Sequence, residues 1–87
     1  MLEEHLDKPV VVDLSSHYVC LGILERIDAL YLELRDADLH DLRDTGTSRE
    51  NYVAAAVATG IKRNRKRVLL ARAEVVAISR QEDVVDE

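Results

Sequence analysis

Apolar and polar side chains alternate without a break between residues 30 and 35. Successive side chains of an extended chain point to opposite faces, so this period of two is typical of a β-strand with one buried face. The segment 30–37 is therefore predicted to be a strand, entered through a tight turn at Asp28 and Ala29. Its two faces would carry Leu30, Leu32 and Leu34 on one side, and Tyr31, Glu33 and Arg35 on the other.

Further strands are predicted from apolar, β-branched composition. In the longest of them Val19, Leu21 and Ile23 share one face. Gly22 in its middle indicates a bend or bulge, as expected where a sheet curls into a barrel. The four additional strands are predicted at residues 10–14, 18–27, 67–71 and 74–80.

The segment 48–59 is predicted to be a helix, because it is rich in alanine and carries signals at both ends. Thr47 and Glu50 have the spacing of a capping box, and Gly60 stands where a C-cap glycine would. A strand through "NYVAAAV" remains open as an alternative. The polar stretch 38–50 before it is expected to be mostly loop.

The two ends of the chain are expected to be minor elements. Leu2 and Leu6 lie four residues apart, which predicts one short helix ended by Pro9. The acidic tail at 81–87 is expected to be frayed.

The chain has 87 residues, which predicts a single domain over 1–87. Hydrophobic residues make up 47% of it, with no Phe or Trp, so the core must be mainly aliphatic. A core this small favours oligomerisation as a further source of stability. The core candidates are Leu14, Leu21, Ile23, Leu32, Leu34, Leu70 and Ile78.

Neither a membrane helix nor a signal peptide is expected, because no apolar run is long enough and the N-terminus is acidic. A single cysteine, Cys20, leaves no internal disulfide and is most simply a small packed side chain. These features predict a soluble, cytoplasmic protein.

Charge is strongly segregated along the chain. Residues 1–44 hold 11 acids and 4 bases, residues 45–72 hold 1 acid and 7 bases, and residues 73–87 hold 5 acids and 1 base. The net charge of −5 therefore hides a basic segment, "KRNRKR" at 62–67. Such a run is most often a solvated loop, but it could also bind a polyanion or an acidic protein.

The order of these elements resembles the Sm/LSm family, as a divergent bacterial-type member. The resemblance rests on "VVVDL", Gly22, Asp28 and "LELRDA" for the first family motif, and on the shape of "VLLARAEVVAI" for the second. It implies a mainly β fold: a five-stranded antiparallel barrel with a short N-terminal helix. The partly helical segment at about 44–66 would be an insertion between strands three and four.

The resemblance also implies an RNA site from which this sequence departs. The family's base-reading Asn would fall on Tyr31 or Leu32, and its Arg-Gly pair on Ala71 and Arg72. The usual base pocket is therefore absent, although Tyr31 could stack on a base. The candidate RNA-binding residues are Tyr31, Lys62, Arg63, Arg65, Lys66, Arg67 and Arg72.

The last two strands are apolar at every position, which predicts that both of their faces are covered. Open strand edges invite pairing with another chain. The resemblance implies that strand four of one subunit pairs with strand five of the next, to form a homo-oligomeric ring. The candidate interface residues are Val68, Leu69, Leu70, Val75, Val76 and Ile78.

Two classes of function follow. One is an oligomeric Sm-like module associated with single-stranded RNA through the basic segment, with weak sequence preference. The other is an oligomeric protein-interaction or scaffold module that has lost RNA binding. No catalytic motif, cofactor site or metal-ligand cluster is evident, so an enzyme is not expected.

Overall fold

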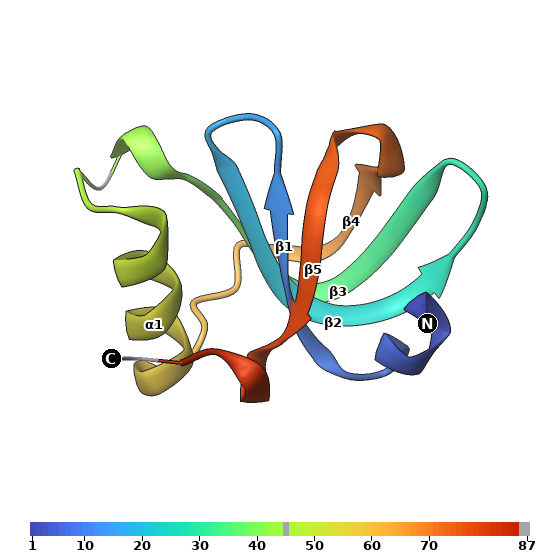
Figure 1. Ribbon diagram of the computed structural model, residues 1–87, viewed down its shortest axis with the longest axis horizontal. Coiled ribbons are helices and arrows are strands. Elements are labelled where there is room, and N and C mark those ends of the chain that lie inside the picture. The colour runs from blue at the N-terminus through green and yellow to red at the C-terminus, as the bar shows by residue number, and fades with distance from the viewer. Residues whose placement is uncertain (45, 86–87) are drawn as a thin grey trace.

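The computed structural model describes residues 1–44 and 46–85. Within them the chain forms one antiparallel sheet of five strands in the order β4-β3-β2-β1-β5. The sheet is strongly bent, and α1 lies to one side of it (Figure 1). This confirms the predicted fold class. The strands are β1 (Pro9–Leu14), β2 (Tyr18–Ile27), β3 (Tyr31–Asp41), β4 (Arg65–Ala71) and β5 (Val75–Arg80).

Over residues 1–44 and 46–85 the helical elements are one α-helix and four short 3₁₀ turns. The α-helix, α1 (Arg49–Thr59), lies between β3 and β4 as predicted, which rejects the strand alternative for this segment. The predicted N-terminal helix is a 3₁₀ turn. The four turns cover Leu2–His5, Leu42–Asp44, Arg72–Glu74 and Gln81–Asp83.

The N-cap of α1 differs from the prediction by one residue. The hydroxyl of Ser48, and not that of Thr47, accepts a hydrogen bond from the backbone N–H of Asn51 at 3.2 Å. The C-cap is Gly60, as predicted, with a φ of 98° that favours glycine.

The pairing of β2 with β3 is irregular around Gly22. The register between the two strands shifts between Leu21 and Ile23, and again between Leu24 and Arg26. Asp36, opposite the first shift, has a φ of 50°. The predicted alternation holds on both sides of Gly22, because Val19 and Leu21 belong to one apolar cluster and Cys20 and Leu24 to the other. Ile23 follows Val19 and Leu21 on their face but is only half-buried, so its prediction as a core residue is wrong.

The main core lies inside the bend and is aliphatic, as predicted. Four of the predicted core residues are buried in it, and Ile78 is half-buried against it, whereas Leu21 is buried in a second cluster. Leu30 was expected on the core-facing side of β3, but it lies in the turn and is 69% exposed. The buried members of the cluster are Val10, Val12, Leu14, Cys20, Leu24, Leu32, Leu34, Ala37 and Leu70.

A second apolar cluster lies on the other face of the sheet. It is formed by Val11, Val19 and Leu21 of β1 and β2, packed against Val53 of α1. The inserted helix therefore covers part of the outer face of these two strands, where Val11, Val19 and Leu21 are buried. Val84 also packs here, so this part of the expected frayed tail is anchored; residues 86–87 lie outside the described range.

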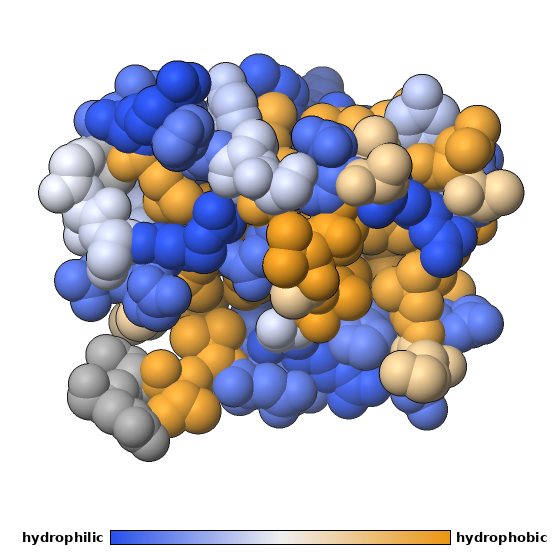
Figure 2. All heavy atoms as spheres, turned by 45° about the horizontal axis from the view of Figure 1, so that its top comes forward, coloured by the Kyte–Doolittle hydropathy of each residue, from blue (hydrophilic) through white to orange (hydrophobic). Residues whose placement is uncertain are grey.

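The edge strands β4 and β5 each have an exposed apolar side chain on one face. Leu69 is 57% exposed and Val76 is 69% exposed. Figure 2 shows an apolar patch in the middle of the molecule, where Figure 1 places β5. The prediction that both faces of these strands are covered does not hold within the single chain.

Two polar segments are more regular than predicted. Residues 38–41, expected to be loop, continue β3 to Asp41. Arg65, Lys66 and Arg67, the second half of the basic segment, belong to β4. Among the described residues no helix is long and apolar enough to cross a membrane.

Candidate nucleic-acid interface

The predicted RNA-binding residues fall into two groups at opposite ends of the β3–β4 pair. Tyr31 lies opposite Ala71 at one end, and Ala37 lies opposite Arg65 at the other. Six residues of extended chain separate the two ends, or roughly 20 Å at 3.3 Å per residue. The structure therefore brings Tyr31 and Arg72 together, and separately gathers the cations of residues 63–67.

The first group surrounds the turn between β2 and β3. The carboxylate of Asp28 accepts hydrogen bonds from the backbone N–H groups of Leu30, at 2.8 Å, and Tyr31, at 2.7 Å. These bonds lower the pKa of Asp28. Asp28 thus has a structural role, because it fixes the turn that presents Tyr31.

Arg72 is engaged with the same turn. Its backbone N–H donates to the oxygen of Leu30 at 2.8 Å, and its guanidinium Nη1 donates to the backbone oxygen of Asp28 at 2.6 Å. The link between β4 and β5 is thereby fixed against the β2–β3 turn. Only the remaining N–H groups of the Arg72 guanidinium are therefore available to a ligand.

The base-reading side chain was expected at Tyr31 or Leu32, and of these two only Tyr31 is exposed. Its side chain lies beside a cavity of about 170 Å³ and is 43% exposed, whereas Leu32 is 1% exposed in the core. Leu32 cannot reach a base, and Tyr31 can offer a ring face. The cavity is lined by Arg26, Ile27, Asp28, Tyr31, Glu33 and Leu69.

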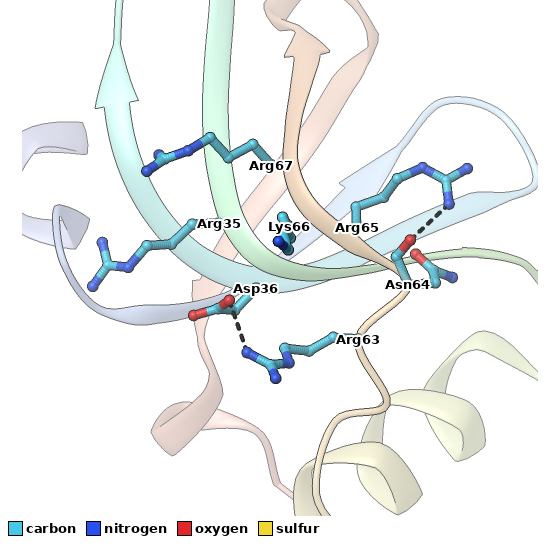
Figure 3. Close-up of a pocket in the computed structure, with 7 residues that line it drawn as sticks. All are labelled: Arg35, Asp36, Arg63, Asn64, Arg65, Lys66 and Arg67. Atoms are coloured by element: carbon cyan, nitrogen blue, oxygen red, sulfur yellow. Dashed lines mark hydrogen bonds and ion pairs between the residues drawn. The ribbon is translucent and has the colours of Figure 1, made fainter.

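The second group lines a larger cavity, of about 510 Å³, at the start of β4 (Figure 3). It contains four of the five predicted cations of the basic segment; Lys62 is not among the lining residues. It also contains Arg35, which the sequence prediction missed. Its lining residues are Arg35, Asp36, Arg63, Asn64, Arg65, Lys66 and Arg67.

Carboxylates neutralise part of this positive charge. Arg63 pairs with Asp36 at 2.9 Å, and Arg67 pairs with Glu25 at 3.3 Å. Among the described residues, Lys62, Arg65 and Lys66 have no carboxylate within ion-pair distance. The segment is therefore less cationic than its sequence alone indicates.

Asn64 fixes the start of the basic segment. Its backbone N–H donates to Ala37 at 2.9 Å, and its side chain accepts from the N–H of Leu39 at 3.0 Å. Its Nδ2 donates to Asp38, 3.1 Å away, which is 4% exposed and also accepts from the hydroxyl of Tyr52. One buried carboxylate thus fixes both α1 and the chain leading into β4.

The predicted interface residues divide by the face they occupy. Leu69 and Val76 are the exposed ones, whereas Leu70 is buried in the core. Val68, Val75 and Ile78 are half-buried and pack against the main core cluster. Only Leu69 and Val76 are free to contribute a large new apolar contact to a partner.

Comparison with known proteins identifies the fold. No family model matches the chain, and no curated protein matches it either. Among solved structures, it is similar to the Pyrococcus abyssii Sm protein, determined in complex with a uridine heptamer. The similarity has a TM-score of 0.63 at 22% sequence identity, and covers 91% of this chain and 90% of that one. Together with the five-stranded antiparallel sheet and its irregular pairing around Gly22, it shows that this chain has the Sm-like fold.

Proposed function

We propose that this chain is a subunit of a homo-oligomeric Sm-like ring that binds single-stranded RNA with weak sequence preference. The observation that carries the proposal is a single outward face on β3 and β4. One end of this face has an exposed aromatic ring, Tyr31, and the other has the cation-lined cavity. The Sm protein of similar fold was solved with a uridine heptamer, which supports the same class of ligand.

The outward face is continuous because side chains alternate along both strands. Tyr31, Glu33 and Arg35 occupy it on β3, and their cross-strand partners are Ala71, Leu69 and Arg67. A single strand of nucleic acid lying along this face would meet a stacking surface at one end and phosphate-binding groups at the other. Aromatic stacking combined with cations is the usual chemistry of single-strand binding.

Weak sequence preference follows from the groups that are missing. No amide side chain stands at the exposed base position, which is taken by Tyr31, and Arg72 already donates to the turn. Stacking accepts any base, and phosphate contacts position a strand without reading it. The cations of residues 63–67 therefore contribute affinity that is sensitive to salt.

The two edge strands of the sheet support the proposed ring. Strands β4 and β5 are the outer strands of the sheet, and each exposes a large apolar side chain, Leu69 or Val76. Pairing β4 of one copy with β5 of the next would satisfy both edges and cover both side chains. A head-to-tail contact of this kind closes into a ring when its rotation permits.

The scaffold alternative is favoured by two observations on charge. Glu25 and Asp36 pair with Arg67 and Arg63, and the chain carries a net charge of −5. Both features oppose the binding of a polyanion. The scaffold reading keeps the ring and its apolar contacts but has no RNA ligand.

Fluorescence anisotropy with a labelled oligouridylate at low salt tests whether the chain is an RNA-binding module or a scaffold. The wild type is expected to bind, and a variant with Lys62, Arg63, Arg65, Lys66 and Arg67 all changed to Gln should lose binding. Tyr31→Ala should weaken binding modestly, near the low end of the roughly 1–3 kcal/mol of a stacked base. Arg43→Gln, an exposed cation paired with Asp41, is the control and should bind normally. Absence of wild-type binding at low salt would favour the scaffold.

A further inference from the structure

Two arginines lie directly opposite each other on the outward face of β3 and β4. Arg35 and Arg67 are cross-strand partners in the register of this pair. Like charges placed opposite each other in a sheet are destabilising. The pair therefore needs a compensating anion.

Glu25 supplies that anion. A single oxygen, Glu25 Oε2, lies 2.9 Å from Nη1 of Arg35 and 3.3 Å from Nη1 of Arg67. Glu25 belongs to the irregular part of β2, where the register shifts between Leu24 and Arg26. An extra residue at a bulge re-aims side chains, and here it brings a carboxylate onto the outward face beside both guanidinium groups.

The two guanidinium groups keep unused donors. Each contacts Glu25 through Nη1 alone, and Arg35 adds one longer contact from the same Nη1 to Asp7, at 3.4 Å. Among the described residues the remaining nitrogens of both groups have no partner. Figure 3 shows both side chains extended to the same side of the 510 Å³ cavity, whereas Arg63 and Asp36 face each other.

We propose that Arg35 and Arg67 together bind one phosphate group, and that Glu25 is a built-in competitor that sets the strength of this binding. Guanidinium groups bind phosphate oxygens through charge-assisted bonds, and two of them can share one phosphate. Lys66 and Arg65, at the edge of the same cavity, add positive potential, whereas Asp7 and Asp36 reduce it. The inference deepens the proposed function and rests on it where the phosphate belongs to RNA.

Substitutions at this site should change the affinity for RNA in opposite directions. Loss of an arginine should weaken binding, and loss of a carboxylate should strengthen it. Arg35→Gln or Arg67→Gln should weaken oligouridylate binding and lower its salt slope by up to about 0.7, the value for the one phosphate contact that the two arginines share. Glu25→Gln removes the competing charge and should tighten binding about fivefold. Asp7→Asn should act in the same direction with a smaller effect, and it leaves the Glu25 contacts in place.

The experiment is anisotropy with labelled oligouridylate, with inorganic pyrophosphate as an unlabelled competitor, on folded variants checked by circular dichroism. Arg43→Gln and Glu50→Gln are matched controls for a lost cation and a lost carboxylate. If RNA binds but all site variants behave like their controls, the phosphate site is rejected while the proposed function stands. Calorimetry can also show that pyrophosphate binds, more weakly to the arginine variants and more tightly to the carboxylate variants. If it does so while RNA does not bind, the phosphate site stands and the RNA proposal fails. Weaker binding by both Asp7→Asn and Glu25→Gln would overturn the role of the carboxylates.

Discussion

A side chain at Gly22 would meet Ala37 at once: a Cβ atom there would lie 3.0 Å from the Cβ of Ala37. It would also lie 3.0 Å from the backbone oxygen of Arg35. Strand β3 thus leaves no room for a side chain at position 22 unless one of the two strands shifts. Close to this contact, Glu25 and Arg35 form an ion pair at 2.9 Å on the outward surface.

Gly22→Ala is therefore expected to destabilise the fold. Overpacking of this kind costs about 1–3 kcal/mol, because one of the two strands must shift. Urea denaturation would measure the change in the free energy of unfolding. The double variant Gly22→Ala/Ala37→Gly should recover part of the loss, since it removes the contact with the Cβ of Ala37, one of three close contacts. A fully stable Gly22→Ala protein would contradict the close packing of β3 against position 22.

Leu34→Ala tests the aliphatic core. Leu34 is fully buried in the main cluster, and truncation of such a residue costs roughly 2–5 kcal/mol. Leu30→Ala is the matched control, because Leu30 is exposed and its loss should change the free energy of unfolding by less than about 0.5 kcal/mol. Equal effects in thermal or urea unfolding would mean that the two leucines are wrongly placed.

Cys20 is expected to be unreactive in the folded protein. The thiol is buried, and burial raises its pKa to about 12, so almost no thiolate exists at pH 8. Ellman's reagent should label it slowly in buffer and rapidly in denaturant. Because the unfolded thiol ionises above a pH of about 9, stability should fall as pH rises from there toward 12. Rapid labelling in buffer would show that the core opens at β2.

The proposed assembly predicts unequal effects of charge at two exposed apolar positions. Leu69→Asp places a carboxylate on the uncovered face of β4 and should reduce the oligomeric mass measured by light scattering. Val85→Asp, in the tail beyond the strands, should leave the mass unchanged. Since Leu69 is exposed in the single chain, neither change should unfold it. A wild type that is monomeric at micromolar concentration would contradict the proposal.

Hydrophobic patterns and capping residues in the sequence predicted most element limits well. They did not predict the burial of every strand residue or the two ends of β3. The limits of 18–27 match β2, and the helix at 48–59 matches α1 to within one residue. Ile23 was predicted to be a core residue because it shares a face with Val19 and Leu21, but the cluster around α1 does not include it. Leu30 was misplaced because the position of the turn depends on how β2 and β3 pair. Residues 38–41 were taken for loop because they are polar, although Asn64 and β2 hold them in a strand.

Only part of the candidate site could be predicted from the sequence, because strand pairing determines the rest. The run of cations at 62–67 is evident from composition. Arg35 and Glu25 join it only through the register of β3 with β4 and the bulge in β2. Alternation alone placed Arg35 on the outward face, but nothing in the sequence set it opposite Arg67.

The most direct test of the central claim compares the affinities of oligouridylate, oligoadenylate and oligocytidylate over a series of salt concentrations. Binding through phosphates and one stacking ring predicts similar affinities for the three. It also predicts a logarithm of affinity that falls linearly with the logarithm of salt concentration. Tight, uridine-selective binding that survives high salt would contradict the account, because it would require a base-reading pocket that Tyr31 and Arg72 do not form.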